Sequence, residues 1–365
     1  MKKILMVVPA IDIRIVKFAE VFSSKNYAIT IVTDKKYTST YQERLNKINN
    51  LKVIVIYKKD YIPTQIIFDP YRFLIYKKIF REEYEFIYSR DAYISYVVLK
   101  LSKKKDNVYV DIADDLLSVA NQTNSISKKL YNFIINTKKV EKFVITNAGK
   151  VMFVCHAAKT HFLKRHNLDR ENTYIVSNAP FFHKQIIKES VYIGSEIKIL
   201  YTGTIDKGIR DFETILSTDS YLTNKIIVDC YVFNHDKSQY VKEIKEKASF
   251  LKNIEINFNA PVKNLNYKNL LAEYQIGIIP HARNEVTDFT IPNKIYDYWE
   301  NNMLIISSDN PSIVGELNEL KQILFYEGEN PVSLAGILND LNNKNFSITT
   351  FTSENSFLQE AKNIF

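Results

Sequence analysis

Short runs of β-branched residues alternate with longer amphipathic stretches along the whole chain. In the first half, the apolar runs predict strands at 3–8, 28–33, 52–57, 86–88, 108–111, 151–154 and 173–176. Between the first two runs, Ile15, Phe18, Ala19 and Phe22 recur at the spacing of one helical face. Strands that alternate with helices in this way are typical of a parallel sheet with crossover helices.

The same pattern restarts in the second half, after Ser177-Asn178-Ala179-Pro180 and a less ordered stretch at 181–195. Here the runs predict strands at 197–202, 226–232, 254–257, 275–279, 303–307 and 323–326, with helices such as 209–217, 265–273 and 292–301. The last residues, 353–365, predict one more helix. We therefore predict two doubly wound Rossmann-like α/β domains facing across a cleft, at 1–180 and 181–345. The segment 346–365 would carry a helix that packs back on the first domain.

The composition fits two soluble cores, because 46% of the 365 residues are hydrophobic and 25% are charged. Only Cys155 and Cys230 are present, far apart in sequence, so neither a disulfide framework nor a zinc cluster is expected. The apolar run after Met1 is too short for a signal peptide, and no run approaches the roughly 18 apolar residues of a membrane span. We expect a cytoplasmic protein.

Positive charge is concentrated in the first domain. The chain has a formal charge of +8, and residues 51–105 hold 12 Lys or Arg against 6 Asp or Glu. Aromatic residues lie between these cations, notably in the predicted helix at 70–83. This mixture suits the inner surface of an anionic membrane, although a solvated helix with inward-facing aromatics explains it equally well. No nucleic-acid-binding motif accompanies the charge, so nucleic acid is not an expected partner.

Two turns of the second domain suit a diphosphate. The segment 201–208 leaves the first strand, and Gly203 lets the backbone approach a ligand while Lys207 and a helix N-terminus attract anions. The second turn precedes Pro292-Asn293-Lys294-Ile295-Tyr296-Asp297, where Lys294 and Asp297 share one helical face. Lys294 could meet phosphate and Asp297 a ribose hydroxyl, although an ordinary ion pair has the same spacing.

These motifs, in this order, resemble bacterial GT-B glycosyltransferases of the family 4-like kind, which make capsule, teichuronic acid and other surface polysaccharides. The resemblance rests on Pro292 to Tyr298 before the strand 303–307, on 199–208, on Asp12-Ile13-Arg14, on the acidic loop Asp111 to Leu116, and on 151–154 and 176–180. It implies a nucleotide-sugar donor, UDP- or GDP-linked, held by the second domain. It implies a glycan or lipid-linked acceptor at the first.

The candidate donor-binding residues are Gly203, Thr204, Lys207, His281, Asn293, Lys294 and Asp297. His281 directly follows a predicted strand and could touch the donor, although a lone histidine is more often structural. Because no DxD motif follows a strand, we expect no metal and no other cofactor, with lysines and helix N-termini stabilising the leaving diphosphate. Asp114 and Asp115 are candidate bases for the acceptor hydroxyl, or a helix cap and its solvated neighbour. Arg14 is a candidate for binding the acceptor, or one half of an ion pair.

The sequence leaves the stereochemical course open. Family 4-like enzymes retain configuration, whereas the Asp114-Asp115 loop offers the base that inversion needs. Two acids eight residues apart are usual in the family, but Phe289 stands where the first would be, and Ala113 replaces a frequent active-site histidine. A sugar-nucleotide epimerase of the same fold, or a non-catalytic nucleotide-sugar-binding partner of a polysaccharide assembly complex, therefore remain alternatives.

Overall fold

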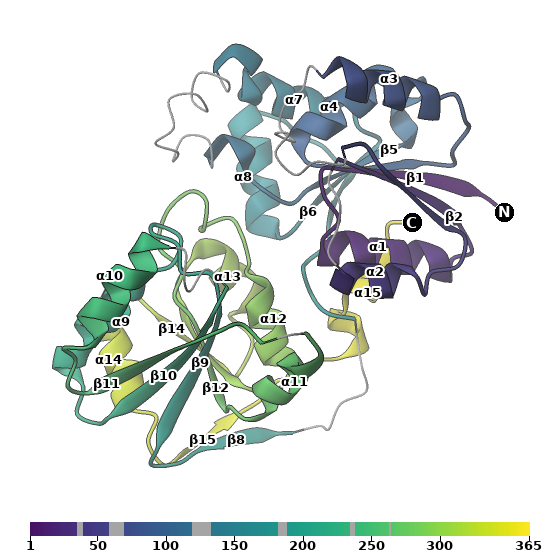
Figure 1. Cartoon of the computed structure of the whole chain (residues 1–365). Helices are drawn as coiled ribbons and strands as arrows, with labels where there is room; N and C mark the ends of the chain where they lie inside the picture. The colour runs from purple at the N-terminus through teal and green to yellow at the C-terminus, as the bar shows by residue number, and fades with distance from the viewer. Residues whose placement is uncertain (35–38, 58–68, 119–132, 182–187, 234–237, 263) are drawn as a thin grey trace. The chain divides into compact units, whose positions relative to one another are not determined.

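A computed structural model describes the chain except residues 35–38, 58–68, 119–132, 182–187, 234–237 and 263 (Figure 1). The chain forms two compact units, and each is described by itself. Unit 1 comprises Met1–Ser177 and Phe357–Phe365, and unit 2 comprises Asn178–Ser356.

Unit 1 is built on a seven-stranded parallel sheet in the order β3-β2-β1-β4-β5-β6-β7. Its strands are β1 (Lys3–Val8), β2 (Ala28–Thr33), β3 (Leu51–Val55), β4 (Ile87–Arg90), β5 (Val108–Ile112), β6 (Lys150–Phe153) and β7 (Thr173–Ile175). Its helices are α1 (Ile13–Ser24), α2 (Ser39–Leu45), α3 (Pro70–Ile79), α4 (Ala92–Leu101), the 3-10 helix η1 (Lys105–Asn107), α7 (Thr137–Asn147), α8 (His156–His166) and α15 (Phe357–Lys362).

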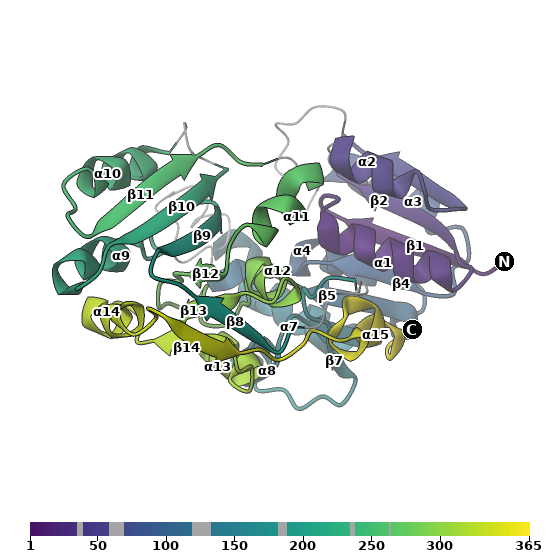
Figure 2. The ribbon, with the colours of Figure 1, turned by 90° about the horizontal axis from the view of Figure 1, so that it is seen from below.

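Helices cover both faces of this sheet. In Figure 1, α3, α4 and α7 lie above the sheet and α1, α2 and α15 below it. Figure 2 shows α15 beside α1, although the two are separated by more than 300 residues of sequence. Phe357 of α15 packs its ring 4.8 Å from that of Phe18, and the terminal Phe365 lies 4.8 Å from Phe22. The end of the chain is therefore part of the core of unit 1.

Unit 2 repeats the design with a six-stranded parallel sheet in the order β11-β10-β9-β12-β13-β14. The strands of this sheet are β9 (Ile197–Gly203), β10 (Ile226–Val232), β11 (Ile254–Asn259), β12 (Ile276–Ile279), β13 (Leu304–Ser308) and β14 (Ile323–Tyr326). A separate pair of strands in unit 2 consists of β8 (Ser190–Ile193) and β15 (Lys344–Ser347). The helices of unit 2 are α9 (Phe212–Thr218), η2 (Asp219–Tyr221), α10 (Gln239–Ala248), α11 (Asn264–Ala272), α12 (Asn293–Glu300), α13 (Pro311–Leu317), α14 (Pro331–Asn339) and the 3-10 helix η3 (Ser353–Asn355).

The predicted parallel strands are all present, with ends that differ from the prediction by no more than two residues. The buried central strands explain this agreement, because β1, β12 and β13 are apolar on both faces and read as continuous runs. The antiparallel pair of β8 and β15 was not predicted, since these short strands bury few of their residues. The predicted terminal helix is divided into η3 and α15.

Candidate functional site

The strand order of each sheet reverses at one place, and ligands of doubly wound folds bind at the carboxyl ends of the strands there. In unit 2 the reversal lies between β9 and β12. In unit 1 it lies between β1 and β4. Of the site residues predicted from the sequence, Gly203, Thr204 and Lys207 lie at the end of β9 and in the loop after it, and His281 lies in the loop after β12.

The loop after β9 carries the first predicted phosphate turn. Gly203 has φ +147°, a conformation that other residues rarely adopt, and its carbonyl accepts a hydrogen bond from the Phe233 amide at 3.0 Å. The carbonyl of Thr204 accepts a hydrogen bond from the hydroxyl of Tyr201 at 2.5 Å. Lys207 is exposed, with its ammonium 6.0 Å from the ring of Tyr240.

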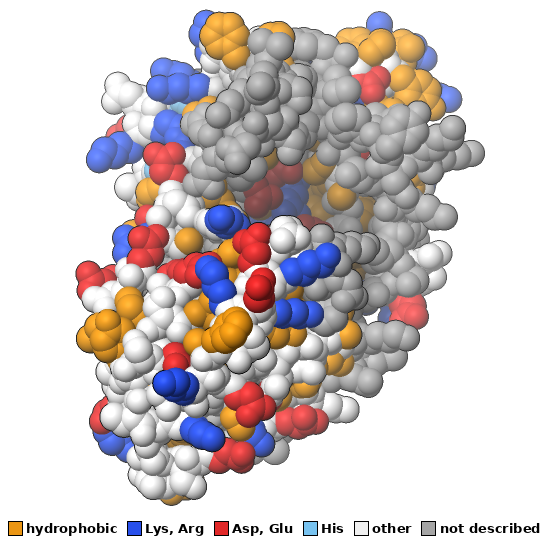
Figure 3. Space-filling model, turned by 60° about the vertical axis from the view of Figure 1, so that its left-hand side comes forward, with side chains coloured by type: hydrophobic (Ala, Val, Ile, Leu, Met, Phe, Trp, Pro, Cys, Tyr) orange, Lys and Arg blue, Asp and Glu red, His pale blue; other side chains and the backbone are white. Residues whose placement is uncertain are grey.

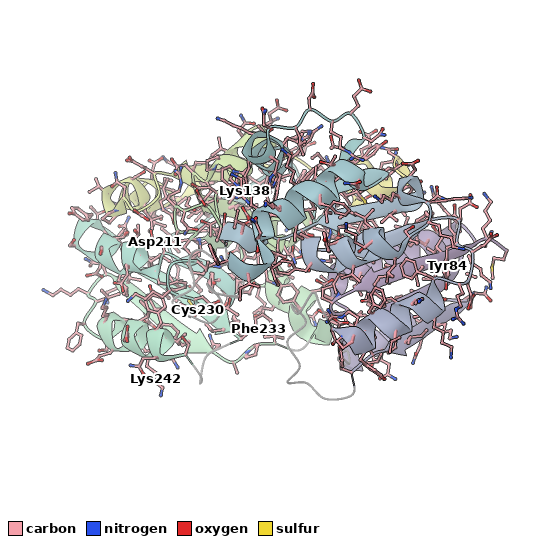
Figure 4. All side chains as sticks on the ribbon, turned by 90° about the horizontal axis from the view of Figure 1, so that it is seen from above. Tyr84, Lys138, Asp211, Cys230, Phe233 and Lys242 are labelled. Carbon is pink, nitrogen blue, oxygen red and sulfur yellow. The ribbon has the colours of Figure 1, made fainter. Side chains whose placement is uncertain are left out.

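The helix that follows this turn begins later than predicted. We expected a helix from residue 209, but α9 begins at Phe212, and the Asp211 carboxylate (Figure 4) caps it by accepting from the Thr214 amide at 3.1 Å. Arg210 is held in an antiparallel bridge with His281 instead. Lys207 therefore lies in a loop five residues before α9, and the expected open helix N-terminus directly behind it is absent.

A second loop, after β12, is fastened to the first one. The Asn284 side chain donates to the Gly208 carbonyl at 2.7 Å, and the Ala282 amide donates to the Ile209 carbonyl at 3.2 Å. The Asp211 amide donates to the Pro280 carbonyl at 2.8 Å. The two turns predicted from distant parts of the sequence are thus one hydrogen-bonded assembly at the carboxyl ends of β9 and β12.

His281 is the most unusual residue of this assembly. Its side chain is only 3% exposed, and neither ring nitrogen has a hydrogen-bond partner among the described residues. Burial, assisted by the charge of Arg210, lowers the pKa of His281 well below its ordinary value. The imidazole is therefore neutral, with one N–H donor and one acceptor that are buried without a partner among the described residues.

Lys294 and Asp297 share a small polar cluster on α12. The Lys294 ammonium lies 3.4 Å from Asp297 Oδ2 and 3.1 Å from the hydroxyl of Tyr267, over whose ring it sits at 4.4 Å. The Tyr267 hydroxyl in turn donates to Asp297 at 3.1 Å and contacts Thr202 Oγ1 at 3.2 Å. The cluster joins α12 to α11 and to β9.

The exposed Asn293 begins α12 next to this cluster. The N-terminus of α12 carries no side-chain cap hydrogen bond, because Pro292 occupies the N-cap position. Tyr267 was not predicted as a site residue, since nothing in a lone tyrosine of α11 indicates that it reaches α12.

In unit 1, a pocket of about 290 Å³ lies at the carboxyl ends of β1, β4 and β5. It is lined by Pro9, Ala10, Asp12, Arg90, Asp91, Tyr93, Ile94, Asp114 and Leu116. Arg90 lies near all three carboxylates of this lining: it is ion-paired with Asp12, and lies 3.9 Å from Asp91 and 3.8 Å from Asp114. The pocket therefore has more carboxylates than cations.

Asp91 directly follows β4 and was not predicted from the sequence. Its backbone has φ +64°, which is uncommon for a residue with a side chain, and its buried Oδ1 has no hydrogen-bond partner among the described residues. Burial raises the pKa of Asp91 to about 7, although Arg90 opposes the rise. A carboxyl group with such a pKa can take up or release a proton at neutral pH.

The structure separates the two predicted aspartates. Asp114 stands at the rim of the pocket with 59% of its side chain exposed. Asp115 is buried and accepts hydrogen bonds from Ser118 at 3.0 Å, His161 at 3.2 Å and Arg165 at 2.8 Å. Burial opposes ionisation, but the bonds from His161 and Arg165 prevail and lower the pKa of Asp115.

Arg14 lies in the core of unit 1, with 3% of its surface exposed. Its guanidinium makes two hydrogen bonds of 2.7 Å to Asp111, and a third of 3.0 Å to the Ser177 carbonyl. Of the two roles that the sequence left open for Arg14, the ion pair is present. The Arg14 guanidinium thus contacts Asp111 and the Ser177 carbonyl.

Among the residues that the structure describes, no group of three or more His, Cys, Asp and Glu side chains could hold a metal ion. In the same part of the chain, no helix is long and apolar enough to cross a membrane.

No protein-family model matches the sequence, and no curated protein matches it. Several solved structures are similar to this one. A glycosyltransferase from Rickettsia africae ESF-5 is 14% identical, with a TM-score of 0.63 over 99% of this chain and 91% of its own. Sucrose-phosphate synthase from Thermosynechococcus elongatus is 13% identical, with a TM-score of 0.66 over 100% and 94%. Anabaena HepE, in complex with UDP and glucose, is 11% identical, with a TM-score of 0.65 over 100% and 94%.

At these identities the likeness concerns the fold. Two Rossmann-like α/β units with parallel sheets of seven and six strands, matched over nearly the whole chain by glycosyltransferases, define the GT-B fold. The fold class predicted from the sequence is confirmed.

Proposed function

We propose that the protein is a glycosyltransferase that moves a sugar from a nucleotide-sugar to a glycan or lipid-linked acceptor of a bacterial surface polysaccharide. The observation that carries the proposal is the assembly at the carboxyl ends of β9 and β12. There an exposed lysine, a paired lysine and a buried histidine, whose ring nitrogens have no partner among the described residues, lie in adjoining segments. The fold supports the reaction class, since the similar structures include glycosyltransferases.

In this proposal the donor binds to unit 2. The diphosphate binds at Lys207, Lys294, Asn293 and the uncapped N-terminus of α12, which together supply positive charge where the leaving group becomes negative. The backbone at Gly203 and Thr204 allows close approach of the ligand.

The remaining donor contacts are to the sugars and the base. Asp297 accepts from ribose hydroxyls, and the neutral imidazole of His281 binds a hydroxyl of the transferred sugar. Phe233, 60% exposed at the end of β10 beside Gly203 and labelled in Figure 4, offers a face on which a base can stack. HepE holds UDP and glucose, which favours a UDP-sugar as the donor. No metal is needed in this arrangement.

The acceptor binds to unit 1, at the pocket that Asp91 and Asp114 line. The anomeric carbon–oxygen bond of the donor breaks, the diphosphate leaves with the electron pair, and the acceptor hydroxyl bonds to the anomeric carbon. Asp91 receives the hydroxyl proton, because its pKa of about 7 leaves much of it ionised at neutral pH. This route corresponds to inversion. Asp115 holds the acidic loop in place through Arg165 and His161.

The proposal is tested by measuring binding and slow hydrolysis of UDP- and GDP-sugars by the purified chain. We expect Lys294→Gln to weaken binding of the donor about 10- to 100-fold, because a hydrogen bond to a charged group contributes roughly 1.5–3 kcal/mol. Lys242→Gln is the matched control, since Lys242 is an exposed lysine of α10 in the same unit (Figure 4).

The outcomes separate the alternatives. Binding of a donor without any turnover, with or without acceptor glycans, would favour a non-catalytic partner protein. Conversion of one nucleotide-sugar into another would favour an epimerase. If Lys294→Gln and Lys242→Gln bind equally well, the donor site is elsewhere.

A further inference from the structure

Helix α3 of unit 1 exposes an unusual set of apolar side chains. Tyr71 is 56% exposed, Phe73 44% and Leu74 64%, all within the first turns of the helix. The opposite side of the helix is anchored in the core, where Arg72 and Tyr76 are 1% and 0% exposed. The exposed apolar residues are therefore not loose ends of a poorly packed helix.

Basic side chains continue the same exposed face. Lys77 and Lys78 lie in the last turn of α3, and Arg81 follows it, all exposed. In Figure 3, orange apolar and blue basic side chains lie together at the upper right of the view. Because residues three, four and seven apart share a helical face, Tyr71, Leu74 and Lys78 form one line from apolar to basic.

Neighbouring acids do not cancel this charge. Glu82 is 3.0 Å from the ammonium of Lys3, and Glu85 is 2.6 Å from that of Lys2. Glu82 and Glu85 are thus each paired with a lysine that lies outside α3. Within residues 77–85, only Glu83 is left to offset the charges of Lys77, Lys78 and Arg81.

Cations at the end of a helix have an ordinary explanation, because they interact favourably with the helix dipole. This explains Lys77 and Lys78, but not why three large apolar side chains face solvent one and two turns earlier. A surface that joins apolar and basic side chains in this order is what an anionic lipid bilayer binds, with aromatics at the headgroup level and cations at the phosphates.

A groove of about 830 Å³ lies along the flank of α3 and extends the apolar surface. Tyr71, Ile75 and Ile79 of α3 form one wall, and Ile54 and Ile56, at the end of β3, lie in the other. Its lining also includes Tyr84, which is labelled in Figure 4, and the charged side chains of Lys3, Lys52, Lys78 and Glu82. Lipid chains at the bilayer surface would therefore meet apolar side chains beyond the three that protrude from α3.

We propose that α3 and this groove dock unit 1 on a bilayer that contains anionic phospholipid. Tyr71, Phe73 and Leu74 enter the headgroup region, Lys77, Lys78 and Arg81 bind lipid phosphate, and the groove covers the first carbons of a lipid chain. This inference is independent of the proposed sugar transfer, since it requires no donor or acceptor.

Sedimentation with vesicles tests the docking surface. We expect the chain to pellet with vesicles of phosphatidylcholine and phosphatidylglycerol at low salt, and to bind pure phosphatidylcholine much more weakly. Replacing Lys77, Lys78 and Arg81 by glutamine should weaken binding about 100-fold, because each basic residue near an anionic surface contributes roughly a fivefold change. The control replaces Lys103, Lys104 and Lys138, which are exposed in the same unit, and should bind like the unaltered chain.

Two further variants test the apolar part. Phe73→Ser with Leu74→Ser removes side chains that are 44% and 64% exposed and keeps the buried anchors of α3. The variant should therefore fold and yet bind vesicles at least tenfold less. Equal loss in the α3 variant and in the lysine control would reduce the effect to net charge and overturn the proposal. Undiminished binding of the Phe73 and Leu74 variant would overturn it as well.

Discussion

At the scale of single residues, burial and hydrogen bonding decide which carboxylates of unit 1 can take part in chemistry. Asp114 and Asp115 are adjacent and look alike in sequence, but Asp115 is tied to Arg165 and His161 while Asp114 faces a pocket. Within the described residues Asp91 has no such set of donors, and it sits in a conformation that few residues adopt. A buried acid without donors holds its proton more tightly, which is why its pKa rises.

The raised pKa of Asp91 predicts a pH-dependent stability. The unfolded chain releases this proton near the ordinary aspartate pKa of 3.8, whereas the folded chain keeps it until about pH 7. Between these values the folded state binds more protons, so stability falls as pH rises through this range and is constant above it. Asp91→Asn should therefore be more stable than the unaltered chain by on the order of 1–3 kcal/mol at neutral to alkaline pH, and this advantage should vanish toward pH 4.

Hydrogen exchange of the β4 amides measures this effect, since they report unfolding of unit 1. Asp169→Asn serves as the control, because that aspartate is exposed and belongs to the same unit. A stabilisation by Asp91→Asn that is the same at all pH values would show that Asp91 is not protonated in the folded state.

At the scale of elements, the sequence predicted the parallel strands because central strands bury both faces and leave long apolar runs. It did not predict what the loops do. The start of α9 was wrong by three residues, since Ile209 and Arg210 pair with the loop after β12 and cannot join the helix. Tyr267 and Asp91 were missed for a similar reason. Their roles come from contacts between elements far apart in sequence, which no local pattern records.

The fastening of the two unit 2 loops predicts that Asn284 positions the donor site without touching the diphosphate. Its carboxamide donates to the Gly208 carbonyl at 2.7 Å and accepts from the amide of Val286 at 3.0 Å. Asn284→Ala should destabilise unit 2 by about 1–2 kcal/mol and speed hydrogen exchange in residues 203–210, because those hydrogen bonds are lost. Affinity for the nucleotide-sugar should fall several-fold.

Asn339→Ala is the matched control for this prediction. The Asn339 side chain joins two segments of unit 2 with similar hydrogen bonds, to the Thr223 amide at 2.9 Å and the Tyr221 carbonyl at 3.0 Å, away from the ends of β9 and β12. The Asn339→Ala variant should lower the stability of unit 2 about as much as Asn284→Ala does, and leave the affinity for the donor unchanged. If both variants lower affinity alike, the effect of Asn284 is one of stability alone.

At the scale of the whole molecule, the chain crosses from unit 1 to unit 2 once and then returns to unit 1 for its last nine residues. The returning segment is held by its aromatic rings, with Phe365 5.3 Å from Phe86 and Phe357 4.8 Å from Phe18. The Glu360 carboxylate accepts from the Ser177 amide at 2.6 Å and from its hydroxyl at 2.8 Å. Residues 357–365 therefore complete the core of unit 1, although unit 2 separates them from the rest of it.

Truncation after Ser356 should consequently destabilise unit 1, although the deleted residues follow unit 2 in sequence. Loss of the fully buried Phe357 alone costs about 3–5 kcal/mol in comparable cores, and the buried Ile364 and half-buried Phe365 are lost with it. Amides of β1 and β4 should therefore exchange much faster. Unit 2 should be nearly unaffected. The only tryptophan of the chain, Trp299, packs edge-to-face against Phe351 within unit 2, with 5.0 Å between the ring centroids. Its fluorescence in urea therefore reports that unit separately. An equal loss of stability in the exchange of β1 and in the Trp299 transition would mean that the two units unfold together and that the C-terminal segment does not act on unit 1 alone.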